Sequence, residues 1–247
     1  MRFDPDALLM ITGGSGGIAQ AVATAARAVG LPHVLLSRRL DPATEPDRLT
    51  LRADATDAAG VAAALTAAAD HFGRPPSLLC QAAGALRLGT AERTSDEAWR
   101  ETLSANLDSS FVSLRAWLTA LGARPGAAVL FSSAAARMGT PGHVAVAAAK
   151  AGVEGLVRAV AADVANRGIR INALAPGLTD TPLARGFLGT ERGRQGATAQ
   201  YPLGRVGDPA ETAAQALWLL SRDSGFLTGQ VIALDGGFSA IRPLVRS

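Results

Sequence analysis

The chain has little of several features that define whole classes of protein. It contains one cysteine, Cys80, which excludes an internal disulfide and fits a reducing compartment. No apolar run approaches the ~20 residues that a membrane-spanning helix needs. No block of like charges occurs and the formal net charge is only +3, so nothing in the sequence indicates a nucleic-acid interface.

The N-terminal stretch MRFDPDALLMITGG also lacks the basic and apolar regions of a secretory signal peptide. We therefore expect a cytoplasmic protein with neither a membrane nor a nucleic acid as partner. The 247 residues are 48% hydrophobic and 18% charged, which is typical of a compact globular chain. Folds of the α/β class often use this length as one domain, and no linker or internal repeat divides the sequence.

Short apolar runs alternate with longer Ala-rich segments of helical periodicity. We expect strands at 7–12, 33–37, 49–54, 77–84, 127–133, 169–177 and 229–237, and helices at 20–30, 57–73, 95–122, 143–167 and 208–221. The strands are continuous apolar runs, as they are when both faces of a sheet are covered. The pattern predicts a single-domain Rossmann-type α/β fold over residues 1–247, with a doubly wound parallel sheet flanked by helices. Residues 183–200 have poor periodicity and several glycines, and we expect a mobile substrate flap there.

A glycine cluster joins the first strand to the first helix. Gly13 and Gly17 bracket a turn that is tight enough for backbone N–H groups to face a pyrophosphate. The N-terminus of the following helix adds the positive end of its dipole at the same place. An ordinary strand-to-helix turn is the alternative, but the position at the first turn of such a chain favours a dinucleotide site.

The end of the second strand bears on the choice of dinucleotide. An acidic residue there would bind the ribose 2′-hydroxyl and select NAD. Here Ser37 stands in that place, and Arg38 and Arg39 follow. Guanidinium groups suit a 2′-phosphate, so the sequence favours NADP(H); two solvated arginines at a strand end are the alternative.

Together, these motifs resemble those of the short-chain dehydrogenases/reductases over nearly the full length. The matching segments are TGGSGGIA (12–19), DATD (54–57), QAAG (81–84), SANLDSSF (104–111), FSS (131–133), Lys150, IRINALAPGLTDTP (169–182) and TGQVIALDGG (228–237). The resemblance implies a nicotinamide cofactor, no metal, and a homo-oligomer, either a dimer or a tetramer. It also implies cofactor contacts from Gly13, Ser15, Gly17, Ile18, Arg38, Arg39, Asp54, Ala55, Ala83, Gly84, Lys150, Pro176, Gly177, Thr179 and Thr181.

The resemblance further implies a catalytic group, of which one member is missing. In that family a serine binds the substrate oxygen, a tyrosine exchanges the proton, a lysine binds the nicotinamide ribose, and an asparagine holds a relay water. Ser133, Lys150 and Asn106 match three of these, but the tyrosine position is Val146. Valine cannot exchange a proton, and general acid catalysis typically contributes about 10²- to 10⁴-fold.

Gln81 and Ala82 replace a pair of asparagines that usually braces the central strands, so we expect compensation nearby. Two side chains come into question as replacement proton donors. His143 lies three residues before Val146 and could act as an acid near neutral pH, or could have no role at the helix start. Tyr201, the only tyrosine, is better interpreted as a packing residue.

Two classes of function remain. The first is an NADP(H)-dependent oxidoreductase that transfers hydride to or from a small, partly apolar ketone, enone or imine without the usual tyrosine acid. The alternative is a cofactor-binding protein without redox turnover, such as a pseudoenzyme, a partner subunit or a non-redox catalyst. The intact glycine turn and Lys150 favour the first class. An apolar part of the substrate is expected from Leu86, Leu88, Leu183, Phe187 and Leu188.

Overall fold

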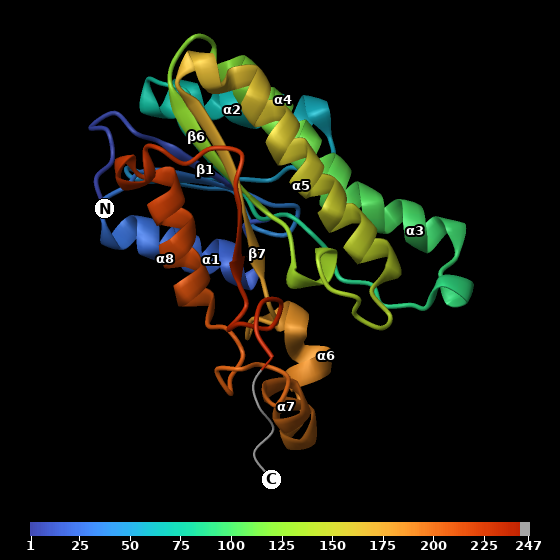
Figure 1. Ribbon diagram of the computed structural model, residues 1–247. Helices are drawn as coiled ribbons and strands as arrows, with labels where there is room; N and C mark the ends of the chain where they lie inside the picture. The colour runs from blue at the N-terminus through green and yellow to red at the C-terminus, as the bar shows by residue number, and fades with distance from the viewer. Residues whose placement is uncertain (243–247) are drawn as a thin grey trace.

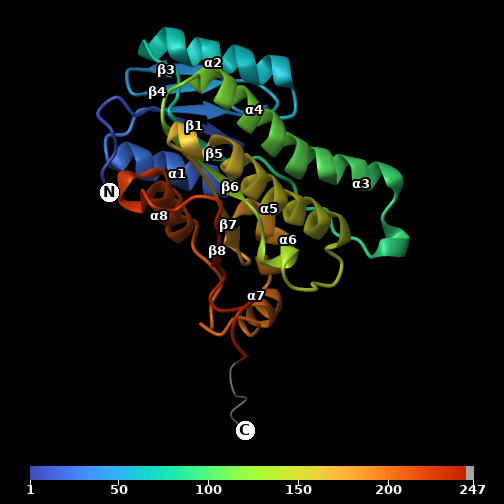
Figure 2. The ribbon, with the colours of Figure 1, turned by 45° about the horizontal axis from the view of Figure 1, so that its top comes forward.

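The computed structural model describes residues 1–242, in which eight strands form one sheet. The strands are β1 (Leu9–Thr12), β2 (His33–Leu36), β3 (Ala43–Glu45), β4 (Arg48–Leu51), β5 (Leu78–Gln81), β6 (Gly126–Phe131), β7 (Ile169–Pro176) and β8 (Val231–Leu234). Their order is β3-β4-β2-β1-β5-β6-β7-β8, and every neighbouring pair is parallel except β3 with β4 (Figure 2). The predicted doubly wound sheet is therefore confirmed.

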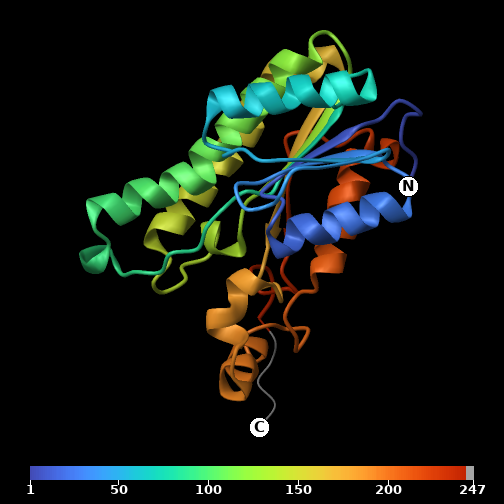
Figure 3. The ribbon, with the colours of Figure 1, turned by 180° about the vertical axis from the view of Figure 1, so that it is seen from behind.

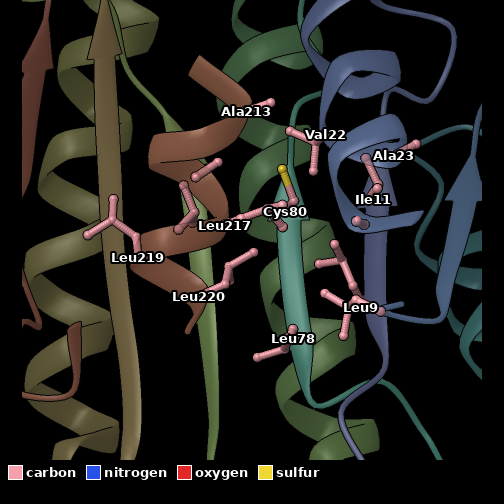
Figure 4. Packing of buried hydrophobic residues seen from close by; sticks show 14 of the residues in the cluster. Leu9, Ile11, Val22, Ala23, Leu78, Cys80, Ala213, Leu217, Leu219 and Leu220 are labelled. Carbon is pink, nitrogen blue, oxygen red and sulfur yellow. The ribbon is translucent and has the colours of Figure 1, made fainter. Parts of the chain in front are cut away.

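Helices cover both faces of this sheet. The α-helices within residues 1–242 are α1 (Gly17–Ala28), α2 (Ala58–Phe72), α3 (Asp96–Leu103), α4 (Ser109–Leu121), α5 (Val144–Val164), α6 (Arg185–Leu188), α7 (Glu191–Thr198) and α8 (Pro209–Leu220). The helices α1 and α8 pack on one face, and α2, α4 and α5 on the other (Figures 1 and 3). Figure 4 shows side chains of β1 and β5 meeting those of α1 and α8, with Cys80 buried among them.

Several helices begin at a side chain that caps them or end at a glycine. The side chains of Asp57, Ser95 and Asp208 accept backbone N–H bonds at the starts of α2, α3 and α8. Gly73 ends α2 in the left-handed conformation, at φ 67°. No helix within residues 1–242 is both long enough and apolar enough to cross a membrane.

The structure corrects the expected elements in three places. The single helix expected over 95–122 is divided into α3 and α4 by a π-helical turn, Ser104–Asp108. The strand β3 was not predicted; it lies in the crossover between β2 and β4, and its Glu45 pairs with Arg27 of α1. The segment 183–200 is not irregular throughout but contains α6 and α7, with a small apolar cluster of Ala184, Leu188, Ala197 and Val206. These helices are too short for a periodicity of 3.6 residues to stand out.

A buried histidine makes the stability of this fold depend on pH. His33 at the start of β2 is 1% exposed, and burial lowers its pKa below the ordinary 6.5. The folded state therefore favours the neutral ring, so stability is fully present above pH 6.5 and is lost as the pH falls through the folded pKa. We expect the free energy of unfolding to fall between pH 7 and 5, and to fall less in His33→Leu. Urea unfolding of both proteins across this range measures the change. If the free energy of unfolding falls equally with pH in the two proteins, His33 is not the cause.

Candidate active site

The glycine turn after β1 lies against two other segments at the carboxyl edge of the sheet. Gly13 has a φ of 70°, and a Cβ atom there would lie 2.6 Å from the backbone of Ala83, just after β5. A Cβ atom on Gly17 would lie 2.9 Å from the side chain of Thr181, which follows β7. Side chains at either glycine would force these three segments apart. The structure thus brings together predicted cofactor residues from three distant parts of the chain.

The N-terminus of α1 is suited to an anion. Its N-cap residue, Gly16, provides no side-chain cap, whereas Asp57, Ser95 and Asp208 cap their helices. The first turn of α1 also contains no acidic residue, and Ser15 beside it is exposed. The free N–H groups and the helix dipole are therefore left for a negatively charged group such as a pyrophosphate.

The end of β2 meets both the glycine turn and the segment after β4. The hydroxyl of Ser37 donates to Ser15 Oγ over 3.1 Å, and the backbone N–H of Arg39 donates to Ser37 Oγ over 3.2 Å. The guanidinium of Arg38 pairs with Asp54 over 3.2 Å. Arg39 is exposed and forms no ion pair within residues 1–242. The Arg38 guanidinium and the hydroxyls of Ser15 and Ser37 thus lie near the end of β2, where a ribose 2′-substituent is expected, and the exposed Arg39 adjoins them.

The other predicted cofactor residues lie at the same edge. Ile18 is the second residue of α1, and Ala55 is buried in the turn after β4. Pro176 is the last residue of β7, and Gly177 and Thr179 form the turn that follows, where the Thr179 hydroxyl donates to Gly177 O over 3.2 Å.

Lys150 is the only lysine in the chain, and its side chain is buried. It is 8% exposed, its Nζ donates to the carbonyl of Phe131 over 2.8 Å, and no carboxylate within residues 1–242 pairs with it. Burial lowers its pKa from 10.5 to about 8. A buried ammonium with one neutral partner retains donors for further acceptors. A Cβ atom on Gly84 would lie 3.6 Å from Nζ, so glycine leaves space beside the amine.

Ser133 follows β6 and keeps its hydroxyl hydrogen available. Its Oγ accepts the backbone N–H of Ala135 over 3.2 Å, and the residue is half-buried. The preceding Ser132 donates to Glu154 of α5 over 2.9 Å, which fixes this end of β6 against the helix that carries Lys150. Ser133 can therefore donate to an oxygen atom in the cleft.

Asn106 lies in the π-helical turn, where its amide is fully engaged. Its Nδ2 donates to the carbonyls of Ala85 and Thr102 over 3.0 and 2.9 Å, and its Oδ1 accepts the N–H of Ala85 over 3.3 Å. Its own carbonyl accepts the Ser110 hydroxyl over 2.7 Å. In this structure Asn106 therefore fastens the loop after β5, which includes Gly84, to the helix behind it.

Sequence reasoning noted Gln81 only as a departure and missed its contacts. Its amide is buried, donates to Ser109 Oγ over 3.1 Å and accepts from Ser110 Oγ over 3.2 Å. These contacts are the compensation expected near Ala82. The signal for them in the sequence was a polar residue at the end of an apolar strand. The compensation is incomplete, because the buried hydroxyl of Thr12, opposite Gln81 in the sheet, has no partner within residues 1–242.

Val146 and His143 lie at the start of α5, on the helix that carries Lys150. Val146 is 5% exposed and stands one turn before Lys150. His143 is the N-cap residue, with Nδ1 2.9 Å from the carbonyl of Pro141. Its ring stacks on Phe187 of α6, with centroids 6.4 Å apart and an interplanar angle of 20°. The start of α5 therefore contacts the predicted flap.

Tyr201 supports the turn after β7. Its Oη accepts the backbone N–H of Leu178 over 2.6 Å, and a Cβ atom on Gly177 would lie 2.7 Å from its ring. Burial raises the pKa of its phenol above the ordinary 10.0. These contacts agree with the interpretation of Tyr201 as a packing residue.

Comparisons with known proteins match both the sequence and the fold. A sequence profile of the family described as Enoyl-(Acyl carrier protein) reductase matches residues 13–239. The 2-(S)-hydroxypropyl-CoM dehydrogenase 3 of Xanthobacter autotrophicus is 33% identical over 95% of this chain and 97% of its own length. The Inactive 2-(S)-hydroxypropyl-CoM dehydrogenase 2 of the same organism is 38% identical over 76% of this chain and 84% of its own. The ligand-free aldohexose dehydrogenase of Thermoplasma acidophilum superposes with a TM-score of 0.89 at 28% identity, covering 100% of this chain and 98% of that chain.

Proposed function

Since the chain belongs to the short-chain dehydrogenase/reductase family, we propose that it is an NADP(H)-dependent oxidoreductase that works without the usual tyrosine. It transfers hydride to or from a small, partly apolar substrate, a ketone, an enone or an imine. The observation that carries this proposal is Lys150, the only lysine, which is buried beside Gly84 and pairs with no carboxylate of residues 1–242. A buried charge of this kind destabilises the fold unless a ligand accepts hydrogen bonds from it, and ribose hydroxyls are suitable acceptors.

The residues at the carboxyl edge of the sheet fit such a cofactor. The N-terminus of α1 would hold the pyrophosphate, Asp54 and Ala55 would lie near the adenine, and Lys150 would bind the nicotinamide ribose. When bound, the nicotinamide ring supplies or accepts the hydride. Ser133 donates to the substrate oxygen, and the segment 183–200 acts as the substrate flap.

The preference for NADP(H) is supported by Arg38, Arg39 and the Ser37 hydroxyl at the end of β2. Charge-assisted hydrogen bonds to a 2′-phosphate contribute about 1.5–3 kcal/mol each, which corresponds to about tenfold or more in affinity. We expect Arg38→Ala and Arg39→Ala each to weaken NADPH binding by about tenfold or more, while NADH binding stays unchanged. Arg100→Ala, at an exposed site on α3, serves as the matched control.

Fluorescence titration of the parent and the three variants with both cofactors measures this preference. The proposal is supported if the parent binds NADPH more tightly than NADH and this preference is lost in Arg38→Ala or Arg39→Ala but kept in Arg100→Ala. If NADH binds more tightly, or if both cofactors weaken equally in the variants, the two arginines do not bind a 2′-phosphate. If neither cofactor binds the parent, the oxidoreductase proposal itself fails.

A substrate panel separates the proposed oxidoreductase from its alternative. The relatives reported above carry the names of dehydrogenases, which supports redox turnover, although one of them is named inactive. Turnover of a ketone, an enone or an imine by the unmodified protein supports the proposed activity. Cofactor binding without turnover of any of them would indicate the cofactor-binding protein without redox chemistry.

We also propose a cytoplasmic homo-oligomer, a dimer or a tetramer. The helices α4 and α5 leave an apolar groove of about 310 Å³, and Phe111 at its rim is 45% exposed. A second groove of about 480 Å³ runs between α2 and α4. Exposed apolar surface of this kind is typical of an interface between subunits. Light scattering after gel filtration tests it, since a monomeric mass would contradict the proposal.

A further inference from the structure

One carboxylate holds both ends of the segment that carries Ser133. The hydroxyl of Ser132 donates to Glu154 Oε1 over 2.9 Å, and Arg137 Nε donates to the same oxygen over 3.0 Å. Glu154 lies on α5 and is 9% exposed. A single buried acceptor on this helix therefore fixes the residue before Ser133 and the residue that ends the turn after it.

The conformation of Ser133 depends on this turn. Ser133 is the N-cap residue of the short 3₁₀ helix Ala134–Ala136, and its Oγ accepts the backbone N–H of Ala135 over 3.2 Å. Arg137 is the C-cap residue of the same 3₁₀ helix, and its Nη2 also donates to the carbonyl of Val231, the first residue of β8, over 3.2 Å. The Arg137 side chain thus ties the turn both to α5 and to the edge strand of the sheet.

Lys150 contacts the same segment from the same helix. Its position four residues before Glu154 places both side chains on one face of α5. Lys150 Nζ donates to the carbonyl of Phe131 over 2.8 Å, and the hydroxyl of the next residue, Ser132, lies 3.3 Å from the backbone carbonyl of Lys150. The end of β6 is therefore fastened to two successive turns of α5. Movement of this segment away from the helix would displace the serine hydroxyl relative to the lysine amine.

No other carboxylate within residues 1–242 can take over this role. Arg137 forms an ion pair with Glu154 and with no other carboxylate of that part of the chain. Arg158 approaches only the second oxygen of Glu154, Oε2, at 3.9 Å, and its side chain is 61% exposed. It does not compete for Oε1, where Ser132 and Arg137 meet. The close contacts of the Glu154 carboxylate therefore belong to the segment that carries Ser133.

We propose that Glu154 is a positioning residue of the site that holds the Ser133 hydroxyl in place relative to Lys150, an inference that rests on the proposed function. Glu154 exchanges no proton with the substrate and acts through Ser132 and Arg137. Its two hydrogen bonds need an acceptor oxygen, which a neutral amide also supplies. Displacing a group that binds the substrate by about 1 Å can lower the rate by about 10²-fold.

The test compares Glu154→Gln, which keeps an acceptor oxygen, with Glu154→Leu, which is similar in size but has no polar atom. Cyclohexanone, cyclohex-2-enone and 2-methyl-1-pyrroline serve as the ketone, enone and imine probes, each assayed with NADPH. We expect Glu154→Leu to lose about 10²-fold in kcat, Glu154→Gln to keep most of it, and both to bind NADPH as tightly as the parent. A merely structural role would not separate kcat from NADPH affinity or be rescued by glutamine. Glu45→Leu, which breaks the ion pair with Arg27 at the other edge of the sheet, is the matched control and should leave kcat unchanged.

A double-mutant cycle examines whether Glu154 acts through Arg137. Arg137→Met removes the second donor and should also lower kcat. The double variant should then lose no more than Glu154→Leu alone, because both substitutions release the same turn. Losses in kcat that multiply in the double variant would overturn the proposal. Thermal melts accompany the kinetics, and if Glu154→Leu does not fold, Arg137→Met and Ser132→Ala provide the comparison with the parent.

Amide hydrogen exchange examines the same turn without a substrate. The backbone N–H groups of Ala136 and Arg137 donate to the carbonyls of Ser133 and Ala134, each over 3.0 Å. Both should exchange faster in Glu154→Leu than in the parent or in Glu154→Gln. Equal exchange in the parent and in Glu154→Leu, or equal kcat in these two proteins, would overturn the proposal. If the parent turns over none of the probes, the proposed function fails, whereas faster exchange in Glu154→Leu still supports the hold of Glu154 on the turn.

Discussion

Val146→Tyr is expected to raise the rate of ketone reduction by about 10²- to 10⁴-fold. Position 146 lies one helical turn before Lys150, on the face of α5 that is turned toward the interior. A phenol there supplies the proton that valine cannot. Steady-state kinetics of the parent protein and of Val146→Tyr with a ketone and NADPH measures the difference.

The control for this experiment is Val146→Phe, since phenylalanine has nearly the same bulk as tyrosine but no hydroxyl. Since Val146 is 5% exposed, either aromatic ring is expected to cost about 1–3 kcal/mol of stability by overpacking. Thermal melts of both variants therefore accompany the kinetics. Equal rates in the phenylalanine and tyrosine variants, at equal melting temperatures, would show that the loss of a proton donor is not what limits this site.

The second large effect is expected at Lys150, where stability and cofactor affinity should change in opposite directions. Burial lowers the pKa of this amine from 10.5 to about 8, so at neutral pH the fold contains a buried charge that costs about 3 kcal/mol. Lys150→Met removes that cost and should increase the free energy of unfolding. The same substitution removes the donor to the ribose and should weaken NADPH binding by about tenfold or more.

The sign of the pH dependence follows from the two pKa values. Below pH 8 the amine is protonated in both the folded and the unfolded chain, and the cost is fully present. Between about pH 8 and 10.5 only the folded chain loses the proton, so the parent gains stability with pH. Urea unfolding should therefore show that Lys150→Met exceeds the parent in free energy of unfolding by more at pH 7 than at pH 10. If the free energies of unfolding of the parent and of Lys150→Met differ by the same amount at pH 7 and at pH 10, this account is contradicted.

Because Lys150 is the only lysine, its pKa can be measured directly. Protein labelled with ¹⁵N-lysine gives one side-chain signal, and the midpoint of its titration should lie near 8. Lys150→Arg is the matched charge control, since a guanidinium keeps the charge but not the compact geometry of an ammonium. A midpoint near 10.5 would mean that the amine is solvated and that its burial is not used for binding.

The alternation of strands and helices could be predicted because it depends on local signals. The strand β1 is a continuous apolar run, and α2 begins at a capping Asp57 and ends at Gly73. The π-helical turn at 104–108 could not be predicted; within it, Asn106 hydrogen-bonds to Ala85, which lies 21 residues earlier. Long-range contacts of this kind leave no periodicity in the sequence.

The candidate site was predictable to a similar extent. Motif spacing indicated Ser133 and Lys150 as a pair, and in the structure Lys150 Nζ donates to the carbonyl of Phe131, two residues before Ser133. The contact between His143 and Phe187 was not predictable, because these residues are 44 positions apart and come from different elements. Residue types in one sequence indicate which chemistry is available, whereas the contacts of a side chain depend on its neighbours in space.

The most direct test of the central claim is a fluorescence titration of the unmodified protein with NADPH and NADH, continued as a turnover assay with secondary alcohols and ketones. The account predicts that NADPH binds more tightly than NADH and that hydride transfer occurs with Val146 in place. Binding of neither cofactor would contradict the assignment of the glycine turn and Lys150 as a dinucleotide site. Tight binding of NADPH without turnover of any substrate would contradict redox catalysis without the tyrosine.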